Sequence, residues 1–94
     1  AGAVILFVTE RLPVDVVEAR RLYEIAALQG QPTAANAYGS MVQGGQGGPV
    51  DLARAMAFFE RAVAGDVTYA GINAAWLIFD NPDLFPDSVL GMAY

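Results

Sequence analysis

The feature that most constrains the fold of this chain is an internal period of 36 residues. Asp15, Asp51 and Asp87 stand at this interval, and the dipeptide Pro-Val precedes the first two of them. Periods of 20 to 50 residues are typical of repeat proteins, in which each unit buries its apolar face only against a neighbouring unit. The sequence therefore predicts one domain over residues 1–94, with repeat units of about 1–30, 31–65 and a truncated 66–94.

Within these units, apolar residues recur with the i, i+3, i+4, i+7 spacing of an amphipathic helix. Asp15, with Glu18 three residues later, is expected to cap the helix that it begins, and Asp51 is expected to do the same in the next unit. Pro32 suits the first turn of a helix, and Asp66 is expected to cap the start of another. No segment shows the alternating pattern of a β-strand. The sequence predicts an all-α protein with helices over about 15–29, 32–43, 51–64 and 66–79, and a further helix that starts near Asp87.

Two kinds of residue are expected to form the packing between units. The aligned pairs Leu22-Tyr23 and Phe58-Phe59 are expected to fill the space between neighbouring units. Small residues let helix axes approach closely, and they account for much of the apolar composition, with ten Gly and 17 Ala. The small residues assigned to helix crossings are Ala19, Ala26, Ala27, Gly39, Ala55, Ala62, Ala74 and Ala75.

Composition excludes several classes of function. With 55% apolar and 16% charged residues, the chain is not intrinsically disordered. A formal net charge of −5 argues against nucleic acid as a partner. The chain has neither Cys nor His, so disulfides, zinc-thiolate sites and the commonest general base are absent. We therefore expect no enzyme, no cofactor and no metal site.

The segments that could suggest chemistry have simpler structural interpretations. The glycines of 44–48 lack the Lys of a phosphate-binding loop and follow no strand, so we expect a turn between helices. Asp80, Asp83 and Asp87 are separated by prolines, and we expect turns and caps there rather than a calcium site. The charges of the first helix are expected to form exposed ion pairs within that helix: Glu18, Arg20, Arg21 and Glu24.

The second unit resembles a Sel1-like repeat, a relative of the tetratricopeptide repeat. The motifs that carry the resemblance are Gly45-x-Gly47 in the loop, Asp51 at a helix start, the basic-Ala pair Arg54-Ala55 and the aromatic pair Phe58-Phe59. The resemblance covers residues 14–79 well and implies a right-handed α-solenoid of antiparallel helix pairs. It further implies an adaptor or scaffold that binds a protein or peptide on its concave face.

Some positions depart from the pattern of this repeat. Tyr38 stands where Leu is usual, Val42 where Tyr is usual, and Gly48 where Val is usual. The third unit has lost the G-x-G motif, and Asp80 to Pro86 take its place. These differences leave the repeat class unchanged but single out the third unit.

Trp76 is the most informative candidate for a binding role, because Trp is a favoured anchor in protein interfaces. It aligns with Ser40, a position that need not pack in the core. Two interpretations are open: Trp76 packs against the Pro-rich segment 82–86, or it faces the concave groove. The second interpretation assigns the protein-binding face to Asn36, Ser40, Gln43, Asn73, Trp76 and Asp80.

Two other roles remain alternatives to a scaffold: a structural subunit of a larger complex, including a membrane-associated one, or a regulatory module of a longer enzyme. The apolar run Ala1–Val8 is too short to span a bilayer. It is either the end of a signal or anchor segment or part of a repeat helix. Apolar residues at both ends also allow contact with further repeats or self-association.

Overall fold

The computed structural model describes residues 15–85, and every regular element in this range is an α-helix. Its four helices have 13 residues each: α2 Val16–Leu28, α3 Pro32–Gly44, α4 Leu52–Ala64 and α5 Thr68–Asp80. Helix α4 begins 36 residues after α2, and α5 begins 36 residues after α3. The 36-residue period and the all-α class are thus confirmed, whereas the helix expected near Asp87 lies outside the described residues.

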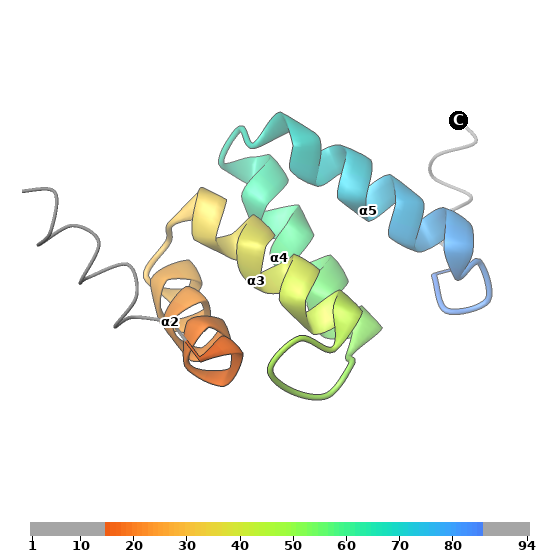
Figure 1. Ribbon diagram of the computed structural model, residues 1–94. Coiled ribbons are helices and arrows are strands. Elements are labelled where there is room, and N and C mark those ends of the chain that lie inside the picture. Colours follow the sequence, from red (N-terminus) through yellow and green to blue (C-terminus); the bar gives the residue numbers. More distant parts are fainter. Residues whose placement is uncertain (1–14, 86–94) are drawn as a thin grey trace, which may run out of the picture.

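Each helix packs against the next one along the chain. Helices α3 and α4 form the centre of the described part, with α2 against α3 on one side and α5 against α4 on the other (Figure 1). Short connections of residues 29–31 and 65–67 join α2 to α3 and α4 to α5, and a longer loop of residues 45–51 joins α3 to α4. The result is a stack in which α3 and α4 are covered most fully.

The starts of α2 and α4 are fixed by the aspartates that define the repeat. The Asp15 carboxylate accepts a hydrogen bond from the Val17 backbone N–H at 3.0 Å, and the Asp51 carboxylate accepts one from the Arg54 N–H at 3.0 Å. Such caps satisfy donors that the first helical turn leaves unpaired and place negative charge at the positive helix end. The predicted capping roles of Asp15 and Asp51 are confirmed.

The predicted capping role of Asp66 is wrong. Helix α5 begins at Thr68, with Val67 at the N-cap and no side-chain cap. Asp66 instead follows the end of α4 with a left-handed backbone, at φ 68°, as Gly30 follows α2 at φ 95°. The three-residue connection needs one such residue, and Asp is among the few non-glycine residues that accept this conformation.

The core lies between α3, α4 and α5. Phe59, Leu77 and Val42 are its largest fully buried side chains. Gly39 makes the close approach of α3 to α4 possible: a Cβ atom there would lie 2.8 Å from the Phe59 ring and 3.2 Å from the Ala55 carbonyl oxygen. The expectation that small residues permit close helix crossings is confirmed at this position.

The aligned aromatic and aliphatic pairs have different environments in the two units. Phe58 and Phe59 are buried as expected, but Leu22 is 54% exposed and Tyr23 is 42% exposed, so the packing expected of the first pair is wrong. The reason is position in the stack. Helix α4 is covered by both α3 and α5, whereas among the described residues α2 packs against α3 and buries only Ala27.

Three side chains from three helices form a polar cluster where α2 meets α3 and α4. The Arg54 guanidinium contacts the Glu24 carboxylate at 2.6 Å and donates from Nε to the Tyr38 hydroxyl at 2.7 Å. The Tyr38 hydroxyl in turn donates to Glu24 at 3.0 Å. The hydrogen bond from Arg54 lowers the pKa of Glu24 and outweighs the partial burial that raises it. The expected pairing of Glu24 within its own helix is therefore wrong.

The Gly-rich loop between α3 and α4 lies directly on the start of α2. The Arg20 guanidinium donates to the carbonyl oxygens of Pro49 at 2.8 Å and Gln46 at 3.4 Å. Gly47 has φ 77°, and a Cβ atom there would lie 2.5 Å from the Val16 carbonyl oxygen. Glycine is needed at this position for both its conformation and its size. The expected turn is confirmed, and Arg20 joins it to α2.

Candidate functional site

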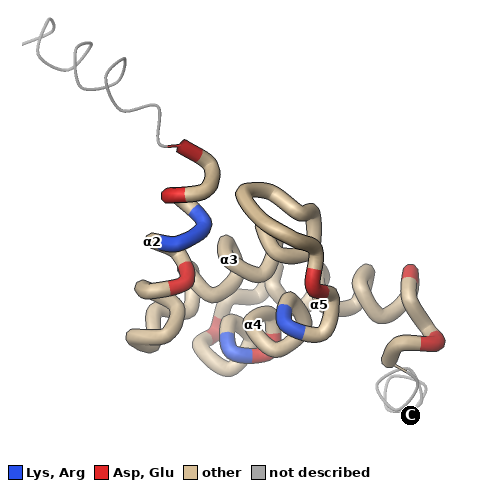
Figure 2. The backbone as a smooth tube through the Cα atoms, turned by 90° about the horizontal axis from the view of Figure 1, so that it is seen from below, with Lys and Arg blue, Asp and Glu red and all other residues tan. Residues whose placement is uncertain are grey.

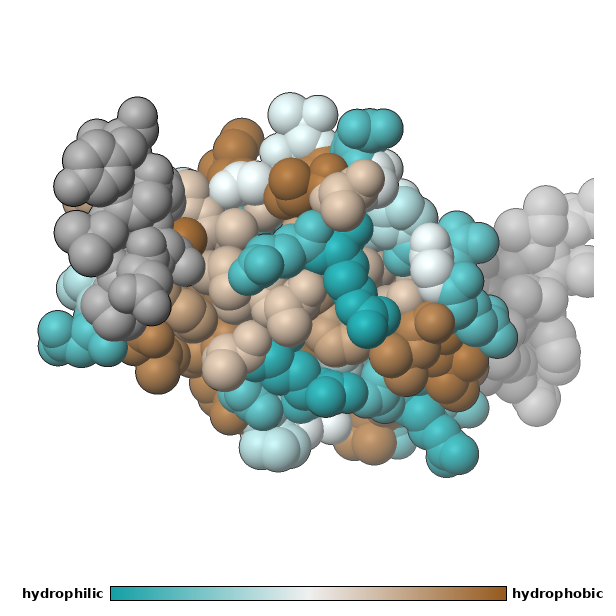
Figure 3. Space-filling model, turned by 180° about the vertical axis from the view of Figure 1, so that it is seen from behind, coloured by the Kyte–Doolittle hydropathy of each residue, from teal (hydrophilic) through white to brown (hydrophobic). Residues whose placement is uncertain are grey.

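An exposed apolar hollow lies on α5. Its walls come from positions i, i+3, i+4 and i+7 of one helix, and it encloses about 290 Å³. Trp76 is 60% exposed, Ile72 58% and Phe79 76%. Apolar side chains also gather in separate patches elsewhere on the surface, between polar ones (Figure 3). The hollow is lined by Ile72, Ala75, Trp76 and Phe79.

Within this hollow, the Trp76 ring packs edge to face against Phe79, with centroids 6.3 Å apart and planes at 73°. Such aromatic pairs hold each other in a defined orientation. Phe85, which belongs to the segment that was an alternative packing partner of Trp76, packs instead against the core. The large ring of Trp76 is therefore presented to solvent by the described part of the chain.

A pair of asparagines joins α3 to α5. The Asn73 side-chain amide donates to the Asn36 side-chain oxygen at 2.9 Å. Asn36 is only 8% exposed, and the burial of its amide is compensated by this hydrogen bond. Asn73 is half-buried, so it retains access to solvent. The hydrogen bond to Asn36 therefore holds the Asn73 side chain in a defined orientation.

The remaining predicted residues lie on the same two helices. Ser40 and Gln43 are half-buried on α3, and Asp80 is exposed at the end of α5. Within residues 15–85, no side-chain hydrogen bond joins any of these three to the asparagine pair. The structure thus brings Asn36 and Asn73 together and places Trp76 in a separate apolar hollow on α5.

Comparison with known families places α2, α3 and α4 in a repeat class. The Sel1 repeat matches residues 9–31 and 32–67, which together are more than half of the chain. The chain belongs to the Sel1 repeat family. Sel1 repeats are helical solenoid repeats that commonly mediate protein interactions, and they are typically not enzymes. No curated protein and no solved structure matches this Sel1 repeat protein.

Two residues of the hollow, Ile72 and Phe79, were not among the predicted site residues. The sequence does contain a signal for them, which is a change from polar to apolar residues at equivalent positions of the repeat. The positions 36 residues earlier, on α3, carry the polar residues Asn36 and Gln43. Replacement of a polar helix face by an apolar one distinguishes the third unit.

The helices also differ in charge. Figure 2 shows that acidic and basic residues lie along α2 and α4, whereas α5 is uncharged except at its C-terminal end.

Other kinds of site find no support among the described residues. In residues 15–85, no group of three carboxylates lies close enough together to hold a metal ion. Asp80 and Asp83 belong to this range, whereas Asp87 lies outside it. None of the four helices of this Sel1 repeat protein is long and apolar enough to cross a membrane.

Proposed function

We propose that this Sel1 repeat protein is an interaction scaffold that binds a protein or peptide partner on the face formed by α3 and α5. The observation that carries the proposal is the exposure of Trp76 in an apolar hollow on α5. An exposed large apolar group in a defined hollow is typical of an interaction site. The proposed face comprises Asn36, Ser40, Gln43, Asn73, Trp76 and Asp80, of which Asn36 is buried and contributes by holding Asn73.

The two parts of this face suggest a division of roles. The hollow around Trp76 fits one aliphatic or aromatic side chain of the partner, which would lose its contact with water there. Asn73 uses one N–H to bond Asn36, which leaves its other N–H and its carbonyl oxygen for the partner. An amide with a free donor and a free acceptor suits a peptide main chain. Asp80 favours a basic residue at the end of α5.

A structural role in a larger complex is the second candidate. Phe79 is 76% exposed, more than any other large apolar residue of the described range, and permanent contact with another subunit would cover it. The two candidate functions differ in the lifetime of the complex with the partner. A scaffold exchanges its partner and is stable without it, whereas a structural subunit aggregates when it is isolated.

The proposal can be tested with a random-peptide display library selected against the full chain. Trp76→Ala is expected to weaken the selected peptides at least about tenfold, which corresponds to about 1.4 kcal/mol. Because Trp76 is exposed, the thermal midpoint is expected to change little. Tyr69→Ala is the matched control, since Tyr69 is a 53% exposed aromatic residue of the same helix outside the hollow.

Binding of each peptide to the wild type and to both variants is measured by titration calorimetry. In the wild type and in Tyr69→Ala, the fluorescence of Trp76, the single Trp of the chain, is recorded as well. A shift of its emission to shorter wavelength is expected as the peptide covers the ring. Selection of no peptide, or equal loss of binding in the Trp76 and Tyr69 variants, would contradict the proposed site. Aggregation of the isolated chain would favour the structural subunit.

A further inference from the structure

Helix α5 has a second apolar side, which the described part of the chain leaves uncovered. On the first side, Ala70 and Leu77 are fully buried in the core. Residues 68–79 include no charged side chain, and a helix that is apolar all round is normally buried all round. Four large residues on the opposite side are nevertheless each more than half exposed, and we call them the α5 stripe: Tyr69, Ile72, Trp76 and Phe79.

The spacing of the α5 stripe is that of a coiled-coil seam. Its members follow one another by three, four and three residues, as positions a and d of a heptad do. In a coiled coil, each a or d side chain inserts into a hole formed by four residues of the facing helix. The hollow beside Trp76 has the form of such a hole, because its walls come from positions i, i+3, i+4 and i+7 of α5. Its shape therefore fits a side chain from a helix that lies along α5.

The charges at the two ends of α5 indicate which helix that is. At the N-terminal end, the N-cap Val67 gives no side-chain hydrogen bond and the first turn has no acidic residue. At the C-terminal end, Asp80 adds negative charge to the negative end of the helix dipole, and the last turn has no basic residue to offset it. An antiparallel helix with the same two ends compensates both, because its acidic end meets the uncapped N-terminus of α5 and its own uncapped N-terminus meets Asp80. A second copy of α5 is such a helix.

We propose that two copies of this chain associate through their α5 stripes, with the two α5 helices antiparallel about a two-fold axis. The inference rests on the proposed function, because it names the protein partner of the Trp76 hollow. In this arrangement Ile72 of each copy enters the hollow beside Trp76 of the other, and Tyr69 faces Phe79. Asp80 of each copy then lies level with the first turn of the other α5. A parallel pair would instead bring the two Asp80 side chains together.

The area of the α5 stripe matches a dimer that forms and separates reversibly. Large aromatic side chains bury about 150–250 Å² each when they are fully covered. Given their exposed fractions, the four side chains bury about 500 Å² in each copy and about 1,000 Å² in total. This total is at the lower limit for a specific protein interface. We therefore expect a weak dimer, whose hollows become free for another partner when the copies separate.

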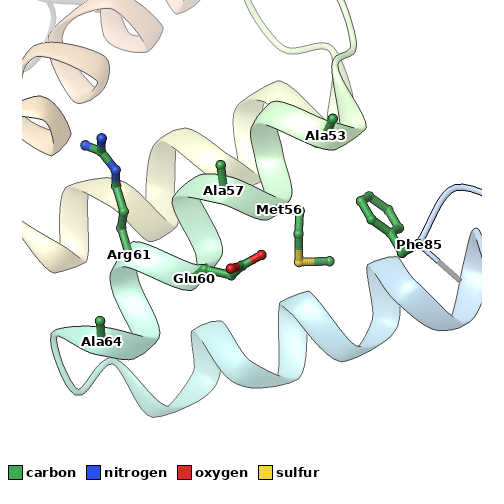
Figure 4. Close-up of a pocket in the computed structure, with 7 residues that line it drawn as sticks. All are labelled: Ala53, Met56, Ala57, Glu60, Arg61, Ala64 and Phe85. Atoms are coloured by element: carbon green, nitrogen blue, oxygen red, sulfur yellow. The ribbon is translucent and has the colours of Figure 1, made fainter. Parts of the chain in front are cut away.

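The larger hollow along α4, which encloses about 570 Å³, is less suited to such pairing (Figure 4). Glu60 and Arg61 line it, and burial of these charges against a second copy costs free energy that the uncharged α5 stripe avoids. Figure 4 also shows Phe85, which follows α5, directed toward Met56 of α4. Phe85 therefore packs on the side of α5 that faces α4 and not on the α5 stripe.

Sedimentation equilibrium of the full chain, from micromolar to millimolar concentrations, tests for the dimer and gives its dissociation constant. Trp76→Ala is expected to raise this constant at least about a hundredfold, because a two-fold interface loses the ring twice. Tyr69→Ala is expected to raise it at least about tenfold, whereas the peptides selected above bind this variant no more weakly than the wild type, because a peptide fills only the hollow. Leu28→Ala, which alters a 56% exposed residue of α2, is the matched control and is expected to leave the constant unchanged. Circular dichroism verifies that each variant is folded.

Exchange of charges between the two ends of α5 tests the antiparallel arrangement. Asp80→Lys is expected to raise the dissociation constant about tenfold, because each new lysine faces the positive end of the other α5. Thr68→Glu places a negative charge at that end, so the double variant is expected to restore the association of the wild type. In a parallel pair the two substitutions lie at opposite ends of the interface, and the second could not compensate the first.

The possible results separate this inference from the proposed function. A chain that stays monomeric at every concentration, yet binds the selected peptides through Trp76, would overturn the dimer and leave the proposed function intact. A monomeric chain for which no peptide is selected would contradict both. A dimer that Trp76→Ala or Tyr69→Ala leaves unchanged would overturn the assignment of the α5 stripe, and failure of the double variant to restore association would overturn the antiparallel arrangement.

Discussion

Gly30 and Asp66 occupy the same position in successive units and share a left-handed backbone, with φ 95° and 68° respectively. Gly30 accepts this conformation without steric cost because it has no Cβ atom. For other L-residues the left-handed region costs roughly 1–2 kcal/mol, with Asn and Asp the most tolerant. The connection from α4 to α5 therefore carries local backbone strain at a position where the connection from α2 to α3 has none.

Asp66→Gly is accordingly expected to stabilise the protein by about 0.5–1 kcal/mol, because relief of the strain exceeds the greater freedom of Gly in the unfolded chain. Urea unfolding followed by circular dichroism measures the change. The reciprocal variant Gly30→Asp is the control and is expected to lower stability by a similar amount. No atom lies within 4 Å of a Cβ built at Gly30, so that loss would come from the backbone alone. Destabilisation by Asp66→Gly would contradict the interpretation.

The features that the sequence predicted correctly are local ones or follow from the repeat. The 36-residue period fixed which helices are equivalent, and the capping roles of Asp15 and Asp51 depend on hydrogen bonds within four residues. Asp66 was misassigned because Asp is favoured both at helix starts and in the left-handed conformation. The sequence offers two plausible roles, and only the three-residue connection decides between them.

Contacts between units could not be predicted from local sequence patterns. Leu22 and Phe58 are equivalent by period, yet burial depends on how many helices cover each one. The Asn36–Asn73 bond joins residues 37 apart, so it is not a contact between equivalent positions. The Glu24–Tyr38–Arg54 cluster likewise combines three helices. For the candidate site, the period could identify the replacement of Ser40 by Trp76, but not the hollow that Trp76 forms with Phe79.

The polar cluster predicts a dependence of stability on pH. The hydrogen bond from Arg54 lowers the pKa of Glu24 below its ordinary value of 4.5. A carboxyl whose pKa is lower in the folded state stabilises the fold above the unfolded value and loses that contribution as the pH falls through the folded value. The wild type is therefore expected to lose stability relative to Glu24→Gln as the pH falls below about 4.5.

Screening by solvent limits how much the Glu24–Arg54 pair contributes to the free energy of unfolding. The Glu24 side chain is 34% exposed and that of Arg54 42%, so we expect a contribution of about 0.2–1 kcal/mol at neutral pH. Urea unfolding at neutral and acidic pH measures it for both proteins. Glu18→Gln, which changes an exposed glutamate of the same helix, is the control and is expected to show a smaller difference. A wild-type advantage over Glu24→Gln that grows toward low pH would refute the assignment.

Burial in the stack predicts a large difference between two positions that the period makes equivalent. Phe58 is 4% exposed, packs edge to face on Tyr38 with centroids 4.6 Å apart, and has the Arg61 guanidinium 5.0 Å from its ring centroid. Phe58→Ala is expected to destabilise the protein by about 3–5 kcal/mol through loss of these contacts and the cavity left behind. Leu22→Ala is expected to cost less than about 1 kcal/mol, because Leu22 is 54% exposed. Denaturant midpoints of the two variants, measured side by side, test this difference. Equal losses would mean that Leu22 is buried as deeply as Phe58, and the position of α2 at the edge of the described stack would then have to be revised.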